Sequence, residues 1–258
     1  MTRMAASNVL IVGLRGLGVE IAKNVCLAGV KSVTIHDPTP VQAADLGTQV
    51  RETPPTPSAD WQFFLRDDDV GKPRDQVTHL RLAELNRYTP VSVLDGELTH
   101  ASIAPFQVVV LVDASIARQI EIDDFTHANG IQFISTTTRG LFSSVFCDFG
   151  PKFACIDTNG EPALTGMVTS IDRDAEGLVT TLDETRHGLE DGDYVSFSEV
   201  EGMTELNGCE PRKISVIGPY TFKIGDTTNL SPYQRGGLFK QVKMPKLIDF
   251  VRRRRRSI

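Results

Sequence analysis

The stretch that decides the fold is Asn8-Val9-Leu10-Ile11-Val12-Gly13-Leu14-Arg15-Gly16-Leu17-Gly18, near the start of a chain of 258 residues. Its first five residues form an apolar run that predicts a buried strand, and a glycine-rich turn follows at once. Residues 19–29 then place apolar side chains at helical spacing and end in a glycine, as helices often do. A second apolar run at 33–35 leads into Asp37. The order strand, glycine turn, helix, strand predicts a right-handed βαβ unit.

The glycine turn differs from the G-x-G-x-x-G pattern of nucleotide-binding βαβ units at one place. Gly13 and Gly18 fill the first and third positions, but Arg15 stands at the second, where a pyrophosphate needs room to approach the backbone. Its guanidinium could instead hold an anion at the positive end of the helix. Asp37 stands where an acid would bind a ribose hydroxyl. The loop predicts either a nucleotide site formed by Gly13, Arg15, Gly16, Gly18 and Asp37, or a scaffold whose site has decayed.

Composition and charge exclude several classes of protein. The net charge of −6 argues against a general nucleic-acid binder, and no apolar run is long enough to span a membrane. The four cysteines are scattered without a C-x-x-C pair, so we expect no zinc site and reduced thiols. We expect Cys26, Cys147 and Cys155 to be buried in apolar elements, and Cys209 to lie in a turn beside Glu210.

The rest of the chain changes character near its middle. Up to about residue 140, predicted strands at 91–94, 106–113 and 131–135 alternate with predicted helices at 71–87 and 116–129. After about residue 165, short strands and turns follow closely, which indicates a small barrel. The fold class is therefore α/β. We expect a Rossmann-like, mostly parallel sheet over residues 1–163, a small all-β barrel domain over 164–246, and a basic tail over 247–258.

Three further features have an ordinary interpretation beside a functional one. His187 lies beside acidic residues and could act as a base, but a turn histidine of this kind is expected to be solvated. The acidic residues Asp172, Asp174 and Glu176 lack the length and closing glutamate of an EF-hand, so we expect a solvated turn. Residues 50–62 contain three prolines among polar residues and predict an irregular, dispensable insertion.

Four blocks of sequence carry a family resemblance. They are S-N-V-L-I-V-G-L-R-G-L-G-V-E-I-A-K-N-V (7–25), D-P-T-P-V-Q-A-A-D-L (37–46), S-T-T-T-R-G-L-F (135–142) and R-H-G-L-E-D-G-D-Y-V-S-F-S-E-V-E-G-M (186–203). The first three resemble the inactive adenylation half of eukaryotic ubiquitin-activating enzymes, which belong to the ThiF/MoeB/HesA-type adenylating family. The fourth resembles the first catalytic-cysteine half-domain. The chain thus resembles an amino-terminal fragment of such an enzyme.

The resemblance implies an activity and a set of partners. The family adenylates ubiquitin with Mg-ATP, forms a ubiquitin thioester and transfers it to a conjugating enzyme, in the cytoplasm and nucleus. For this chain it implies the scaffolding half, with ubiquitin and an active adenylation half as partners, and no cofactor, nucleic acid or membrane of its own. Conjugating enzymes would bind only through domains beyond this chain. No cysteine here matches the family's nucleophile, and the arginine that reaches the ATP phosphates has no counterpart.

Two stretches differ from the family, and other functions stay open. Residues 50–62 and 251–258 have no counterpart, and our hypothesis is that both are introns read through into protein. The arginine run at 252–256 could equally be a nuclear signal or an anion-binding patch. One alternative function is an independent Rossmann-type nucleotide enzyme with a barrel substrate domain. The other is a non-catalytic binding subunit for a ubiquitin-like modifier or its activating partner.

Overall fold

Two compact units make up the part of the chain that the computed structural model describes, residues 2–47, 64–182 and 186–254. The first unit comprises Met1–Phe153 and Asp249–Ile258, and the second comprises Ala154–Ile248. The second unit is therefore inserted into the sequence of the first. The first change from one unit to the other falls after residue 153, and residues 249–254 group with the first unit. The proposed insertion at 50–62 lies outside the described residues.

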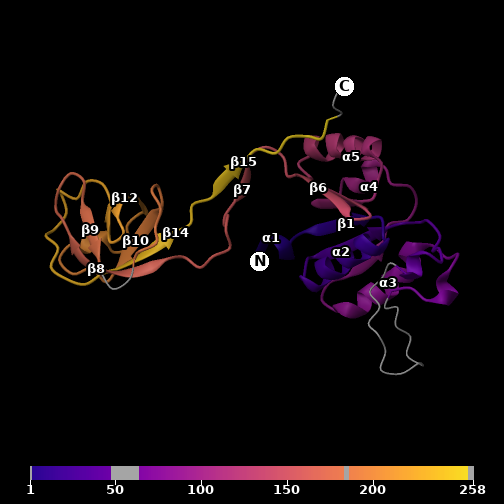
Figure 1. Cartoon of the computed structure of the whole chain (residues 1–258), viewed down its shortest axis with the longest axis horizontal. Coiled ribbons are helices and arrows are strands. Elements are labelled where there is room, and N and C mark those ends of the chain that lie inside the picture. Colours follow the sequence, from indigo (N-terminus) through magenta and orange to yellow (C-terminus); the bar gives the residue numbers. More distant parts are fainter. Residues whose placement is uncertain (1, 48–63, 183–185, 255–258) are drawn as a thin grey trace. The chain divides into compact units, whose positions relative to one another are not determined.

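The first unit is built on a six-stranded sheet with the order β3-β2-β1-β4-β5-β6. Figure 1 labels β1 and β6 of this sheet and the helices α1 to α5 of the same unit. Strands β1 to β5 are mutually parallel, and β6 pairs antiparallel with β5 at one edge. The mostly parallel Rossmann-like sheet predicted from the sequence is confirmed. The strands are β1 (Asn8–Val12), β2 (Ser32–His36), β3 (Val91–Val93), β4 (Val108–Val112), β5 (Gln132–Arg139) and β6 (Phe142–Asp148).

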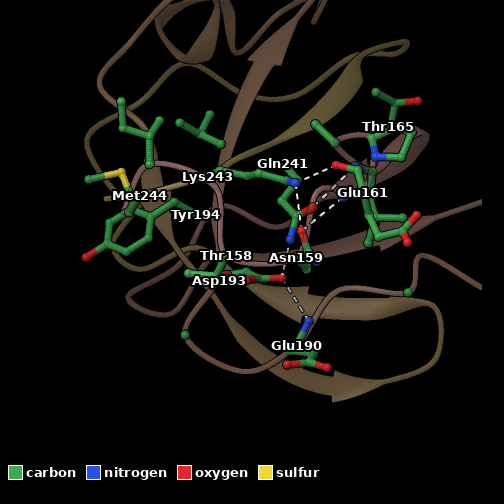
Figure 2. A pocket seen from close by; sticks show the side chains of 17 residues that line it. Thr158, Asn159, Glu161, Thr165, Glu190, Asp193, Tyr194, Gln241, Lys243 and Met244 are labelled. Carbon is green, nitrogen blue, oxygen red and sulfur yellow. Dashed lines mark hydrogen bonds between the residues drawn. The ribbon is translucent and has the colours of Figure 1, made fainter. Parts of the chain in front are cut away.

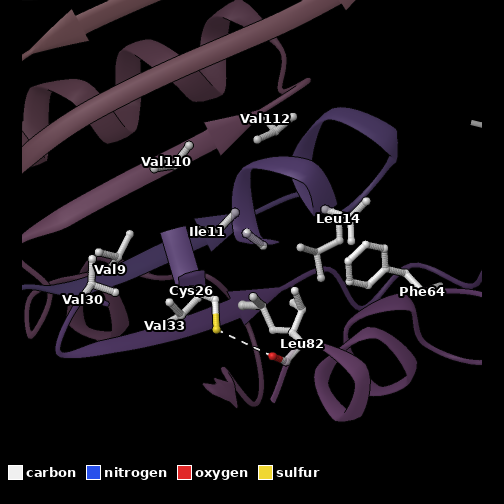
Figure 3. Packing of buried hydrophobic residues seen from close by; sticks show 13 residues of the cluster. Val9, Ile11, Leu14, Cys26, Val30, Val33, Phe64, Leu82, Val110 and Val112 are labelled. Atoms are coloured by element: carbon white, nitrogen blue, oxygen red, sulfur yellow. Dashed lines mark hydrogen bonds between the residues drawn. The ribbon is translucent and has the colours of Figure 1, made fainter. Parts of the chain in front are cut away.

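Helices cover both faces of this sheet. The helices are α1 (Thr2–Ala5), α2 (Gly16–Leu27), α3 (Arg74–Leu85), α4 (His100–Ile103) and α5 (Ile116–Ala128). Figure 3 shows one apolar layer, in which Cys26 of α2 and Leu82 of α3 lie against Ile11 and Val110 of the sheet. A second layer packs α4 and α5 against the opposite face, where Leu10, Leu111 and Phe133 are fully or almost fully buried. Alternate residues of each strand therefore fill two separate cores, as a parallel sheet buried on both sides requires.

The ends of α3 differ from the sequence prediction. The helix begins at Arg74, directly after Pro73, because a proline fixes the backbone and ends any helical run before it. The acidic residues ahead of it form a separate 3₁₀ turn, η2 (Asp67–Asp69), which lies before the helix predicted over 71–87. A second such turn, η1 (Asp45–Gly47), follows β2. Asp69 accepts hydrogen bonds from the side chains of Lys72 and Arg81. The bond from Arg81 connects η2 to α3.

The second unit is the small β-barrel that the sequence predicts. Its seven strands run in the order β11-β10-β14-β8-β9-β13-β12, and the two edge strands are separated in sequence only by Ile214. The sheet therefore curls until its edges meet, around a core that includes Phe197, Phe222 and Phe239. The strands are β8 (Thr165–Ile171), β9 (Leu178–Thr181), β10 (Tyr194–Ser198), β11 (Arg212–Lys213), β12 (Ser215–Gly218), β13 (Thr221–Lys223) and β14 (Leu238–Val242), with a 3₁₀ turn η3 (Thr204–Leu206).

A short ribbon completes the secondary structure. Strand β7 (Phe153–Cys155) pairs with β15 (Lys246–Ile248) at the two points where the chain passes between the units. Over the described ranges, no helix is long and apolar enough to cross a membrane. The same ranges hold no cluster of three or more His, Cys, Asp or Glu side chains suited to a metal ion.

Candidate functional site

The glycine loop between β1 and α2 is the predicted site, and its first and third glycines are required by close packing. Gly13 has a φ of +90°, and a Cβ there would lie 2.7 Å from the carbonyl oxygen of Val112 on β4. A Cβ at Gly18 would lie only 1.8 Å from the carbonyl oxygen of Gly13. Gly16 begins α2. These glycines therefore provide the tight turn and the close approach of helix to strand that the pattern predicts.

Asp37, at the end of β2, faces back onto the glycine loop. One carboxylate oxygen, Oδ2, accepts a hydrogen bond from the backbone N–H of Leu14 at 2.8 Å, and the other, Oδ1, accepts from the hydroxyl and N–H of Thr39. Burial favours the neutral acid, but these hydrogen bonds and a neighbouring guanidinium outweigh it and hold the pKa of Asp37 below its ordinary value of 3.8. Both oxygens of Asp37 are therefore engaged within the protein.

The neighbouring guanidinium belongs to Arg74, the first residue of α3, which is 1 % exposed. Its Nη1 lies 2.7 Å from Asp37 Oδ2, and its Nη2 lies 2.6 Å from Asp45 Oδ2. It also donates to the Thr39 hydroxyl and to the Pro40 carbonyl. A buried arginine needs such partners, because an unpaired charge in the interior is strongly unfavourable. Arg74 thus ties the glycine loop, the segment after β2 and α3 into one polar cluster.

Arg15 has a different environment from Arg74. It is the N-cap residue of α2, with an extended backbone, and its side chain is exposed. Among the described residues it makes no side-chain hydrogen bond or ion pair. It therefore leaves its charge free at the amino-terminal end of α2, where backbone N–H groups favour negative charge.

The structure brings together only some of the predicted site residues. Gly13, Gly18 and Asp37 meet around the loop, while the exposed Arg15 side chain makes no hydrogen bond to Asp37 or to its partners among the described residues. Arg74 and Asp45 are the members that sequence reasoning missed. They lie 37 and 8 residues beyond Asp37. Asp45 belongs to the quoted block 37–46, but nothing in that block or around Arg74 indicates that the two side chains form an ion pair.

His187, which we expected to be solvated, is buried in the barrel, so that expectation was wrong. It is 7 % exposed, its Nε2 lies 2.8 Å from the Gly218 carbonyl, and its Nδ1 accepts a hydrogen bond from the Leu189 N–H at 3.0 Å. The ring also meets Phe222 edge to face. With both nitrogens engaged by backbone groups, His187 holds two loops together. The acidic turn at 172–176 is exposed, as expected, and Asp174 caps the backbone there.

A polar cavity of about 830 Å³ lies at one end of the barrel (Figure 2). The ammonium of Lys243 is held by Asp157 at 2.7 Å, by the Asn159 side chain at 2.8 Å and by the Glu161 carbonyl. Gln241 donates to Asp193 at 2.8 Å. Lys243 and Gln241 are therefore already paired within the protein, and the described residues that line the cavity show no nucleophile hydrogen-bonded to a base.

The four cysteines are free thiols in different surroundings. Burial raises the pKa of the Cys26 and Cys147 thiols. Cys26 is buried, which confirms the expectation for it, whereas Cys147 is only half-buried, so its predicted burial was wrong. Cys155 is only half-buried and donates to the Asp157 carbonyl, so its predicted burial was wrong. Cys209 is half-buried and donates to the Glu210 carbonyl.

Two family models match the chain. Residues 1–55 match the ThiF family, and residues 174–243 match the ubiquitin-activating enzyme E1 FCCH domain. The first match covers the βαβ unit with the glycine loop, and the second covers most of the barrel. The two matches thus fall on the two compact units separately.

Curated relatives match over almost the whole chain. The chain is 53 % identical over 250 residues to ubiquitin-activating enzyme E1 1 of Schizosaccharomyces pombe, and 50 % identical to ubiquitin-like modifier-activating enzyme 1 of Mus musculus. These alignments cover 97 % of this chain but only 23 % and 22 % of the relatives. The chain therefore spans less than a quarter of the length of these relatives.

Among solved structures, the Escherichia coli MccB complex with succinimide is similar at a TM-score of 0.47 and 15 % identity. That match covers 60 % of this chain and 45 % of the other, and at this level it adds nothing to the fold described above. The sequence identity, together with the ThiF and FCCH matches, decides the family. The chain belongs to the ubiquitin-activating enzymes of the ThiF type.

Proposed function

We propose that the chain serves ubiquitin activation as the scaffolding half of the adenylating unit, joined to the first catalytic-cysteine half-domain. Its relatives of about 50 % identity are named as ubiquitin-activating and ubiquitin-like modifier-activating enzymes. In this proposal, the chemistry of adenylation and thioester formation belongs to parts of these enzymes that the chain does not match.

The engagement of Asp37 is the observation that carries this proposal. A ribose hydroxyl would have to displace Leu14, Thr39 or Arg74 from a carboxylate that already accepts hydrogen bonds on both oxygens. Each displaced donor would be left buried without a partner, which costs about 1–3 kcal/mol. Arg15 adds a bulky side chain at the phosphate approach. The residues present therefore do not fit Mg-ATP, which the parent enzyme would bind in its active half.

The thiols support the same conclusion. A ubiquitin thioester needs an accessible cysteine of lowered pKa, whereas burial raises the pKa of Cys26 and Cys147. Among the described residues, no basic side chain forms a hydrogen bond or ion pair with Cys155 or Cys209. The barrel thus contributes binding surface rather than a nucleophile.

Ubiquitin and the active adenylation half are the proposed partners. Exposed apolar side chains at the β5–β6 turn and along β6 support a contact there, because Leu141, Phe142 and Val145 are 101 %, 80 % and 69 % exposed. Contiguous exposed apolar residues on an edge strand are typical of an interface. Conjugating enzymes would be bound by other domains of the parent enzyme.

Titration of the whole chain with Mg-ATP, followed by calorimetry, tests the proposal. We expect no binding below millimolar concentrations, and no ubiquitin-dependent exchange of pyrophosphate into ATP. The matched variant Arg15→Gly restores the glycine pattern but leaves the Asp37–Arg74 contacts in place, so it should not bind ATP either. Micromolar binding by the unmodified chain would refute the proposal. Binding gained only by Arg15→Gly would make Arg15, and not the engagement of Asp37, the cause.

A further inference from the structure

Residues 249–253 form a strap that lies on the first unit beside α5, β5 and β6. The Asp249 carboxylate accepts a hydrogen bond from the Lys152 N–H at 2.8 Å, and the Phe250 N–H donates to the Gly150 carbonyl at 3.1 Å. The Phe250 ring packs against Phe149 and Phe153, with ring centroids 4.8 and 5.9 Å away. This aromatic contact fixes the start of the strap and brings the following arginines to α5.

Arg253 makes the most specific contacts of the strap. Its backbone N–H donates to Asp123 Oδ2 at 2.5 Å, and its guanidinium Nη1 donates to the Ser135 hydroxyl at 3.1 Å. The guanidinium carbon lies 5.2 Å from the centroid of the Phe146 ring. A planar cation over an aromatic face is favourable, and arginine suits this arrangement better than lysine.

The groups that receive Arg253 are buried. Asp123 and Ser135 are 0 % and 2 % exposed, and Asp123 Oδ1 has no hydrogen-bond partner among the described residues. Arg253 reaches Asp123 through its backbone N–H and not through its guanidinium, and a buried carboxylate needs such donors because an unpaired polar group in the interior is costly. Arg252 adds an exposed ion pair to Asp124, with 3.3 Å between Nη1 and Oδ1.

We propose that Asp123, Asp124, Ser135 and Phe146 form an arginine-recognition site, which we call the arginine shelf, and that its resident ligand is the chain's own Arg252–Arg253. The shelf binds a peptide segment with two adjacent arginines. A main-chain N–H of the segment donates to a buried carboxylate, and one guanidinium lies between a hydroxyl group and an aromatic face. An anionic partner of the arginine run would have to compete with the shelf for these two residues. The shelf therefore reduces the number of arginines that the run offers to such a partner.

Amide hydrogen exchange in the full chain tests the arginine shelf. Nuclear magnetic resonance would follow the amides of residues 250 and 253 in the unmodified protein and in Arg253→Lys, which keeps the charge and the backbone N–H but loses the planar guanidinium. The matched control is Arg254→Lys, because Arg254 is exposed and makes no hydrogen bond or ion pair among the described residues. Ser135→Ala provides a second variant on the receiving side.

We expect exchange at residue 253 to accelerate about tenfold in Arg253→Lys, the factor that corresponds to loss of one strong polar contact. Ser135→Ala should accelerate it about threefold, and Arg254→Lys should leave it within about twofold of the unmodified protein. Equal exchange rates in Arg253→Lys and Arg254→Lys would overturn the proposal, since the strap would then be held by its backbone and Phe250 alone. Fast exchange at residue 253 in the unmodified protein, as fast as at Arg254, would overturn it as well.

Discussion

Replacing Asp123 by asparagine should stabilise the first unit at neutral pH. Asp123 lies on α5, fully buried, and burial raises its pKa from 3.8 to about 6. The nearby carboxylates of Asp148 and Asp124 contribute to this rise, while the Arg253 N–H and His127 oppose it. Because the folded state binds the proton more tightly than the unfolded chain, stability from this group is largest at acidic pH and is lost as pH rises through 6.

The size of this effect follows from the two pKa values. At 1.36 kcal/mol per unit of pKa difference, ionised Asp123 lowers the free energy of unfolding by about 3 kcal/mol at pH 7.5. At pH 5 the same linkage lowers the free energy of unfolding by only about 1.6 kcal/mol. The free energy of unfolding should therefore be about 1.4 kcal/mol larger at pH 5 than at pH 7.5. Asp123→Asn keeps an oxygen that can accept from the Arg253 N–H but removes the charge. It should therefore raise stability at pH 7.5 by up to about 3 kcal/mol and abolish this gain.

Urea denaturation followed by circular dichroism at 222 nm measures the free energy of unfolding of the first unit, since all α-helices in the described ranges belong to it. The matched control is Asp124→Asn on the next residue of α5, which is exposed and should shift stability by less than about 0.5 kcal/mol at either pH. If Asp123→Asn destabilises the unit at pH 7.5, or shows the same gain toward pH 5 as the unmodified chain, then Asp123 is not an uncompensated buried acid.

Three further changes test the glycine loop, its polar cluster and the thiols. Arg74→Met should lower the free energy of unfolding, measured by urea denaturation, by about 3–5 kcal/mol, because it leaves Asp37 and Asp45 buried without their cation. Lys72→Met, at an exposed ion pair, should lower it by less than about 1 kcal/mol. Similar losses in the two variants would contradict the role of the cluster. Gly18→Ala should abolish the folded helical signal, and Gly47→Ala, where a Cβ meets nothing within 4 Å, should leave it intact; a well-folded Gly18→Ala protein would contradict the packing. Iodoacetamide should modify Cys209 well before Cys26, whose thiol pKa is raised by burial, and equal rates in a peptide map would speak against that burial.

Local pattern predicted the first unit well. The strand at 8–12 and the helix that follows its glycines lie within two or three residues of their predicted positions, because apolar periodicity and glycine chemistry act over short spans. Strand β14 was not predicted. It is short and follows Gly236 and Gly237, and its position between β8 and β10 depends on pairing with residues at least 40 positions away in the sequence. Such a strand is specified by its partners rather than by its own sequence.

The polar cluster and the buried histidine show a different limit. Arg74 reads in the sequence as an ordinary charged residue in the first turn of an amphipathic helix, and only the fold brings Asp37 and Asp45 to it. His187 sits among acidic residues in the sequence, yet the fold places Gly218 and Leu189 around its ring. Sequence neighbours therefore predicted the wrong surroundings for His187 and none of the partners of Arg74.

The hydrogen bond between Lys152 and Asp249 closes a loop of 97 residues, and this has a consequence for the order of folding. Bringing the ends of so long a chain together costs loop-closure entropy, which falls by about 2 kcal/mol if the effective loop shrinks to about ten residues. Prior folding of the barrel provides that shrinkage, because β7 and β15 at its two ends pair with each other. We therefore expect the barrel to fold early and the strap to join the first unit late. Mutations in the barrel core should then slow the last folding step of the first unit, although they lie in the second.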